Sequence, residues 1–103
     1  MVERRPIAFR RIAEEAAQRS ESILARWLPD GRRDGGEWIA RNPRRADRRL
    51  GSFKVNLKTG RWGDFATGDG GGDLISLAAF LFDLNQAEAA LRVAEMLGVC
   101  PFD

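Results

Sequence analysis

The sequence contains no histidine and a single cysteine, Cys100, and these two shortages exclude several kinds of site. A disulfide within the chain is impossible, and a zinc site of cysteine and histidine cannot form. A serine nucleophile would lack a histidine base, so acid–base chemistry would depend on carboxylates, which the sequence does not pair at a defined spacing. We therefore predict a chain with no catalytic activity of its own, no cofactor and no metal.

Long hydrophobic runs are also missing. No apolar segment approaches the roughly 20 residues that a helix needs to span a bilayer. The first residues include Arg4 and Arg5 but no apolar stretch after them, so they do not form a secretory signal. Together with the single cysteine, these features predict a cytoplasmic location without membrane association.

Lysine is scarce, with 2 residues against 15 arginines, and the charge is unevenly distributed. Residues 26–61 carry 11 basic and 4 acidic groups, a net charge of +7, whereas residues 62–103 carry 1 basic and 7 acidic groups, a net charge of −6. Arginine presents a planar fork of donors that matches phosphate and stacks on rings. The asymmetry favours a polyanionic partner for the middle segment, and the alternative is that the basic and acidic parts face each other.

Hydrophobic periodicity predicts an α+β fold in one domain spanning residues 1–103. We expect a helix at 8–28, a turn-rich connector at 29–36, a small antiparallel three-stranded sheet at 37–65 and two helices within 73–97. The first helix has a weak point at Ser20-Glu21-Ser22 that could split it. In the last helix, we expect these residues to face inward: Ala87, Ala90, Leu91, Ala94 and Leu97. Residues 99–103 resemble the start of a linker.

The predicted sheet contains a hairpin, because residues 52–56 and 61–65 alternate in polarity around a turn that ends at Gly60. Trp62 on the returning strand has two interpretations. It is either part of the core, the commoner fate of tryptophan, or a partly exposed platform for base stacking. The same choice is open for Trp38 on the preceding strand.

The glycine-rich segment 67–73 leads into the very apolar helix predicted at 74–82. It lacks the lysine of a phosphate-binding loop and the glycine spacing of a dinucleotide site. We interpret Gly71 and Gly72 as turn residues and Asp73 as the N-cap of the following helix, which should be buried. A magnesium site formed by Asp64, Asp69 and Asp73 is a weaker alternative.

The candidate binding residues are cations in and around the arginine-rich segment 44–49. They are Arg41, Arg44, Arg45, Arg48, Arg49, Lys54, Lys58 and Arg61, all expected to contact phosphates. Trp62, Trp38 or Phe65 could stack on bases if exposed. A solvated loop is the plain alternative for segment 44–49, since charge runs usually are solvated.

Residues 37–82 resemble the N-terminal zinc-ribbon domain of bacterial and phage DNA primases. The resemblance is carried by Gly51-Ser52-Phe53-Lys54-Val55-Asn56, the aromatic strand at Gly60-Arg61-Trp62, Phe65, and Gly71-Gly72-Asp73 before a buried helix. The zinc ligands of that family are replaced. Their positions fall at or near Asn42, in Arg44-Arg45, and at about Asp64 and Thr67, so the resemblance implies a version that has lost its metal.

This resemblance implies noncatalytic binding of single-stranded template DNA within a primase or primase-helicase of a mobile element or prophage. The chain could then be the N-terminal part of a longer protein whose separate catalytic domain makes the primer. The alternative is a protein-interaction module that docks on a replication polymerase, primase, helicase or host factor, including as an inhibitor. We expect the first and last helices to supply the stability that a structural metal otherwise contributes.

Overall fold

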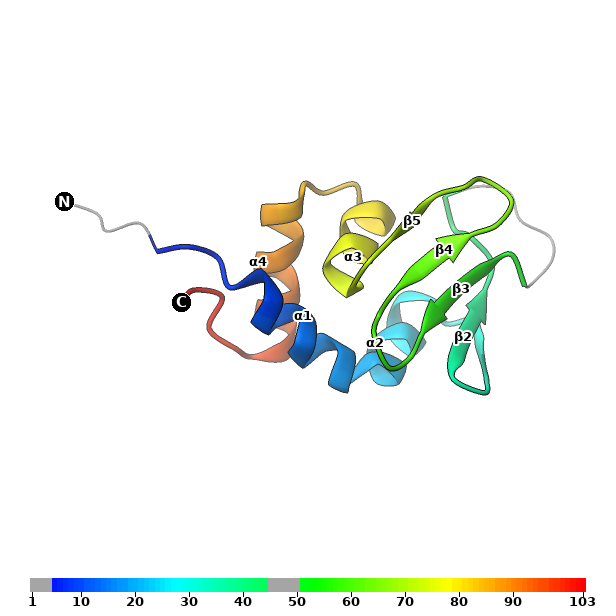
Figure 1. Cartoon of the computed structure of the whole chain (residues 1–103), viewed down its shortest axis with the longest axis horizontal. Helices are drawn as coiled ribbons and strands as arrows, with labels where there is room; N and C mark the ends of the chain where they lie inside the picture. Colours follow the sequence, from blue (N-terminus) through cyan, green and yellow to red (C-terminus); the bar gives the residue numbers. More distant parts are fainter. Residues whose placement is uncertain (1–4, 45–50) are drawn as a thin grey trace.

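The computed structural model describes residues 5–44 and 51–103, with helices at both ends of the sequence and a sheet between them (Figure 1). The helices are α1 (Phe9–Gln18), α2 (Ser20–Trp27), α3 (Leu74–Phe82) and α4 (Gln86–Leu97). The strands are β1 (Arg32–Asp34), β2 (Glu37–Ala40), β3 (Phe53–Asn56), β4 (Trp62–Asp64) and β5 (Gly70–Gly71). Each strand pairs antiparallel with the next one in the sequence. The predicted α+β class is confirmed.

The sheet is wider than predicted because a short strand adds to each edge. β1 lies within the segment 29–36, which was predicted to be a connector, and its side chains are all exposed. β5 consists of Gly70 and Gly71 in the predicted glycine turn, and it pairs with β4. Neither edge strand alternates apolar and polar side chains, so the pattern that identifies half-buried strands does not detect them. Backbone pairing alone extends the sheet here.

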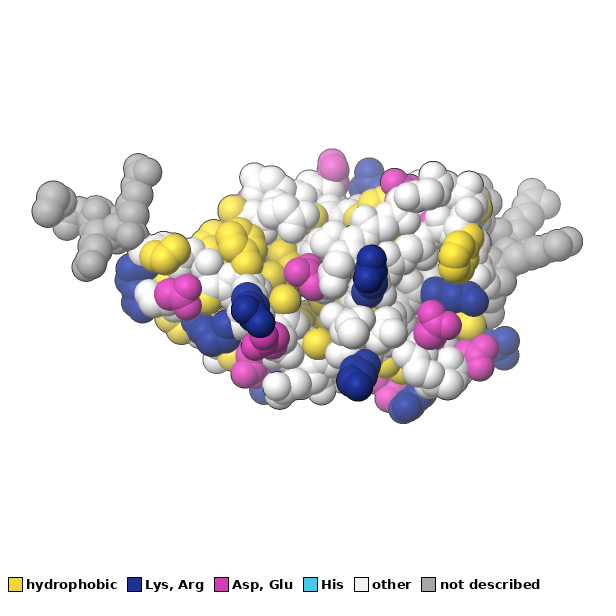
Figure 2. Space-filling view, in the orientation of Figure 1, with side chains coloured by type: hydrophobic (Ala, Val, Ile, Leu, Met, Phe, Trp, Pro, Cys, Tyr) yellow, Lys and Arg dark blue, Asp and Glu magenta, His cyan; other side chains and the backbone are white. Residues whose placement is uncertain are grey.

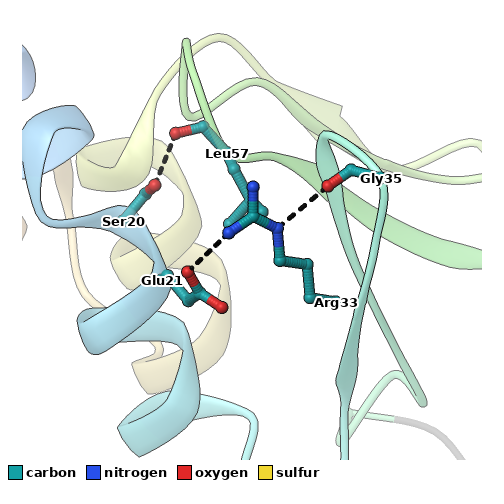
Figure 3. Close-up of polar contacts among 5 residues, drawn as sticks. All are labelled: Ser20, Glu21, Arg33, Gly35 and Leu57. Carbon is teal, nitrogen blue, oxygen red and sulfur yellow. Dashed lines mark hydrogen bonds and ion pairs between the residues drawn. The ribbon is translucent and has the colours of Figure 1, made fainter.

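The predicted helix 8–28 is divided into α1 and α2 by a break at Arg19. The break lies one residue before the weak point seen in the sequence. It allows the buried Ser20 side chain to donate a hydrogen bond to the carbonyl of Leu57, in the turn after β3 (Figure 3). This contact joins the start of α2 to the sheet, and α2 lies behind the sheet in Figure 1.

One face of the sheet forms the core. Trp38, Val55 and Trp62 are neighbours in register on this face, and all three are buried. The ring of Trp62 also contacts Phe53 and Phe80, with centroid distances of 5.7 Å and 4.8 Å. Phe53, Trp62 and Phe80, here called the aromatic cluster, connect the sheet to α3. Trp62 and Trp38 are thus core residues, and their interpretation as stacking platforms is wrong.

The glycine segment ends as predicted, in a capped helix. The Asp73 carboxylate accepts a hydrogen bond from the Ser76 amide at 2.8 Å, which confirms its role as the N-cap of α3. Gly71 is required by close packing, since a Cβ there would lie 1.9 Å from Ser76 Oγ and 2.6 Å from Trp62 Nε1. A Cβ on Gly72 would meet nothing within 4 Å, so only the first of these two glycines is fixed by packing.

The two C-terminal helices are buried differently from the sequence prediction. Helix α3 is buried in its first half, but Phe82 at its end is 51% exposed. In α4 the inward residues are Ala89, Ala90, Val93, Ala94 and Leu97, whereas Ala87 and Leu91 are exposed. The predicted stripe was therefore wrong at two positions. A helix of alanines offers several nearly equivalent apolar stripes, and packing against α1 and α3 selects among them.

Residues at the C-terminal end pair with residues before α1 and do not form a linker. Ile7 and Phe102 form an antiparallel bridge, and the amide of Ala8 donates to the carbonyl of Pro101 at 2.8 Å. Within the described residues, no single helix is long and apolar enough to cross a membrane. Only α3 and α4 together, which meet at a bend of 109°, reach that length and composition.

Candidate nucleic-acid interface

The face of the sheet opposite the core carries one row of residues that crosses all five strands. Arg32, Ile39, Lys54, Gly63 and Gly70 are successive partners in register, and we call them the outer row. Side chains alternate between faces along a strand, so the outer row points away from Trp38, Val55 and Trp62. In Figure 1 this face is turned toward the viewer, and the described helices lie behind or beside it.

The β4–β5 side of this face has a glycine floor with an aromatic ring beside it. Gly63 and Gly70 are paired and present backbone where other residues would present side chains. Phe65, one residue beyond β4, is 81% exposed. The turn is fixed by Asp64, whose carboxylate accepts the Ala66 amide at 2.8 Å and whose carbonyl accepts the Gly68 amide at 2.8 Å. Phe65 is therefore an aromatic side chain held outside the core by an ordered turn.

Three predicted cations lie on the hairpin that carries this region. The ammonium of Lys54 lies 5.6 Å from the centroid of the Phe65 ring, within the range of a cation–π contact. Arg61 precedes β4, where its carbonyl accepts the Asn56 amide at 2.7 Å, and its side chain is exposed. Lys58 is exposed in the turn between β3 and β4. These three cations come from one hairpin, as the sequence predicted.

The remaining predicted cations are placed differently. Arg41, one residue beyond β2, lies 3.8 Å from Asp30 in an exposed ion pair. The Arg44 guanidinium lies 5.7 Å from the centroid of the Phe80 ring, on the aromatic cluster. The predicted contacts of Arg45, Arg48 and Arg49 lie outside the described residues.

Arg32 belongs to the outer row but was not among the predicted site residues. The two neighbouring arginines of β1 point to opposite faces. Arg33 donates to the Glu21 carboxylate and to the Gly35 carbonyl, both at 3.0 Å, and so ties β1 to α2 (Figure 3). Recognising β1 as a strand would have separated these two arginines, because alternation along a strand assigns them to different faces.

Acidic side chains limit where a polyanion could bind. The next row on the same face contains two acidic residues, Asp34 and Glu37, with Asn56 as the following partner in register. It lies two residues along each strand from the outer row. Figure 2 shows Lys and Arg side chains spread over this face, with Asp and Glu side chains between several of them. The β1–β2 edge is therefore mixed in charge, whereas Lys54, Lys58 and Arg61 lie on the β3–β4 side. A phosphate backbone would be attracted most strongly to that hairpin.

Two of the positions that the resemblance aligns with zinc ligands are joined by a hydrogen bond. Asn42 Nδ2 donates to Asp64 Oδ2 at 2.8 Å, and both residues are 2% exposed. The oxygen of the same side chain, Asn42 Oδ1, accepts the Arg44 backbone amide at 2.9 Å. Asn42 follows β2 and Asp64 ends β4, so this buried pair connects two segments that flank β3. It cross-links the end of the sheet without a metal.

The described aspartates do not form the alternative magnesium site. Asp64 is bound to Asn42, Asp69 accepts the Thr67 hydroxyl at 2.7 Å, and Asp73 caps α3. Across residues 5–44 and 51–103, no group of three or more acidic or cysteine side chains could hold a metal ion. The three carboxylates have separate local roles, and the magnesium hypothesis is wrong.

Comparisons with known proteins add no family, since no family model and no curated protein matches this chain. The resemblance to primase zinc ribbons therefore stays a prediction from the sequence. The geometry can bind and orient an extended polyanion with an exposed base, through cations, a bare backbone and one ring.

Proposed function

We propose that this protein binds single-stranded DNA, without catalysis, on the outer face of its sheet. The observation that carries the proposal is the exposed Phe65 ring, with Lys54 against it and the Gly63–Gly70 floor beside it. An exposed aromatic ring loses contact with water when a base stacks on it, and stacking of this kind requires a base that is not paired in a duplex.

The cations would hold the backbone of the strand. Lys54 contacts the ring, and Arg61 and Lys58 lie toward the turn at the other end of the same hairpin, so a DNA strand that runs along the hairpin from a stacked base has positive partners for its phosphates. Because Gly63 and Gly70 have no side chains, the DNA strand can approach the backbone of the sheet closely. Contacts of this type bind with strong salt dependence and little sequence preference. Arg45, Arg48 and Arg49 would add phosphate contacts from the segment that joins β2 to β3.

The resemblance to primase ribbons indicates the kind of protein in which this binding would occur. We infer an accessory domain of a cytoplasmic DNA primase or primase-helicase, with primer synthesis in a separate catalytic domain. The buried Asn42–Asp64 pair fits this proposal, because it supplies a cross-link where the related ribbons use a metal.

Fluorescence anisotropy with a labelled oligothymidine strand and with a duplex tests the proposal. We expect the single strand to bind more tightly, and replacing Phe65 by alanine to weaken binding by about 1–3 kcal/mol, the range for loss of one stacked base. Phe9→Ala is the matched control, since Phe9 is a partly exposed phenylalanine of α1, away from the sheet. Equal affinity of wild type and Phe65→Ala for the single strand would contradict the proposed surface.

A further inference from the structure

A second candidate surface lies between the helices, away from the outer face of the sheet. It is a groove of about 430 Å³ between α2, α3 and α4, which we call the helix groove. Its main lining residues are Trp27, Phe82, Leu84, Arg92, Val93 and Met96. Phe82 is 51% exposed and meets the Trp27 ring edge-on, with a centroid distance of 5.6 Å. Aromatic residues, methionine and arginine are the types enriched in protein interfaces.

One residue that lines the helix groove, Arg92, is charged. Arg92 is the only basic residue in the acidic segment 62–103. Three other exposed arginines form ion pairs, which are Arg10–Glu14, Arg33–Glu21 and Arg41–Asp30. Within the part of the chain that the structure describes, Arg92 makes no ion pair. Glu88, one turn earlier on α4, accepts the Asn85 amide in the capping box of that helix.

We propose that the helix groove binds an amphipathic helix of a partner protein that carries a carboxylate at the edge of its apolar face. Large apolar side chains spaced at i, i+3 or i+4, and i+7 would contact Trp27, Phe82 and Met96. The carboxylate would pair with Arg92, whose guanidinium fork matches it in geometry. Methionine suits such a groove because its flexible side chain adapts to the shape of the occupant.

Other occupants fit these features less well. Nucleic acid is disfavoured because Arg92 is the only cation among the lining residues of the groove, which are otherwise apolar. A second copy of this chain would need to bring an apolar helical face with a carboxylate, and the apolar side chains of α4 are largely used inside the core. The inference does not depend on DNA binding, because it concerns a different surface.

Selection from a displayed library of amphipathic helical peptides, with varied apolar and charged positions, provides the probe. We expect enriched peptides to share one acidic residue beside three apolar ones, and Phe82→Ser to weaken their binding at least about tenfold, as expected for an interface hot spot. The control is Phe9→Ser, which changes a partly exposed phenylalanine elsewhere and should leave peptide affinity within about twofold.

A charge exchange makes the test specific. Arg92→Glu should weaken the selected peptide, and a lysine in place of the peptide's acidic residue should restore binding to that variant alone. The contact can also be observed directly. The chain has two methionines, Met1 and Met96, so the methyl NMR spectrum has few methionine signals, and that of Met96 should shift on binding.

Three outcomes would overturn the proposal. The first is a library without enrichment for the acidic apolar pattern. The second is a set of enriched peptides that bind Phe82→Ser and Arg92→Glu as well as wild type. The third is concentration-dependent self-association of the wild type that Phe82→Ser abolishes, which would make a second copy the occupant. For each variant, an unchanged dispersion of the amide NMR signals establishes that the protein is folded.

Discussion

The sheet and the helices of this small protein each expose a phenylalanine, but in opposite chemical surroundings. Phe65 lies beside Lys54 and a glycine floor, on a hairpin whose flanking segment is strongly basic. Phe82 lies beside Trp27 in a mainly apolar groove whose lining carries one charged residue, Arg92. We therefore propose different ligands for the two rings, a nucleobase at Phe65 and an apolar helix at Phe82. The charge around each ring decides which ligand it fits.

The two ends depend on each other through the aromatic cluster. Phe53 and Trp62 come from the sheet and Phe80 from α3, so the contact is the main aromatic junction between them. The buried Asn42–Asp64 pair lies on the sheet side, and the Asp73 cap lies at the start of α3. Substitutions at these three places test how the sheet and the helices are held together. We expect their effects on the free energy of unfolding to decrease in this order.

Breaking the junction should have the largest effect. Trp62→Ala removes the ring that contacts both Phe53 and Phe80, and we expect it to lower the free energy of unfolding by about 3–5 kcal/mol. Urea denaturation followed by circular dichroism measures the change. A loss below about 1 kcal/mol would mean that the sheet and α3 are not held together by this ring.

Removing the polar cross-link at the end of the sheet should have an intermediate effect on the free energy of unfolding. Asn42→Ala takes away the amide that donates to the buried Asp64 carboxylate, and we expect a loss of about 1–3 kcal/mol in unfolding free energy. Thr67→Ala removes an exposed polar contact in the nearby turn and should cost less than about 0.5 kcal/mol. Equal effects of the two substitutions would show that the buried pair does not act as a cross-link.

Weakening the start of α3 should have the smallest effect. Asp73→Ala removes the side chain that caps the helix, and we expect a loss of about 1 kcal/mol in thermal or urea unfolding. Asp69→Ala serves as its control, because Asp69 is exposed and its carboxylate accepts only the nearby Thr67 hydroxyl within the described part of the chain. If the two variants unfold alike, the cap contributes nothing beyond an ordinary surface carboxylate.

The parts predictable from sequence are those fixed by local chemistry. The hairpin with Gly60 and the cap at Asp73 both depend on a few neighbouring residues. The edge strands β1 and β5 were missed because backbone pairing with β2 and β4 forms them without an apolar pattern. The inward face of α4 was misplaced because its alanines permit more than one stripe.

The candidate site was predictable in composition but not in arrangement. Lys54, Lys58 and Arg61 belong to the predicted hairpin, yet the sequence left Trp62 between core and surface. The register of the sheet decides which aromatic ring is buried. Trp62 is the partner of the buried Val55, whereas Phe65 lies beyond the end of β4 and is exposed. The helix groove had no sequence signal, because it requires α2 to lie against residues at the end of α3 and in α4.

The salt dependence of single-strand binding tests the central claim most directly. Affinity of an oligothymidine strand would be measured at several salt concentrations for wild type, Lys54→Ala, Phe65→Ala and the α1 control Arg10→Ala. We expect Lys54→Ala to reduce the slope of log affinity against log salt by about 0.7, the value for one lost phosphate contact on a single strand. Phe65→Ala should lower affinity at every salt concentration with an unchanged slope, and Arg10→Ala should change neither. Identical slopes and affinities for all four proteins would contradict binding on the outer face of the sheet.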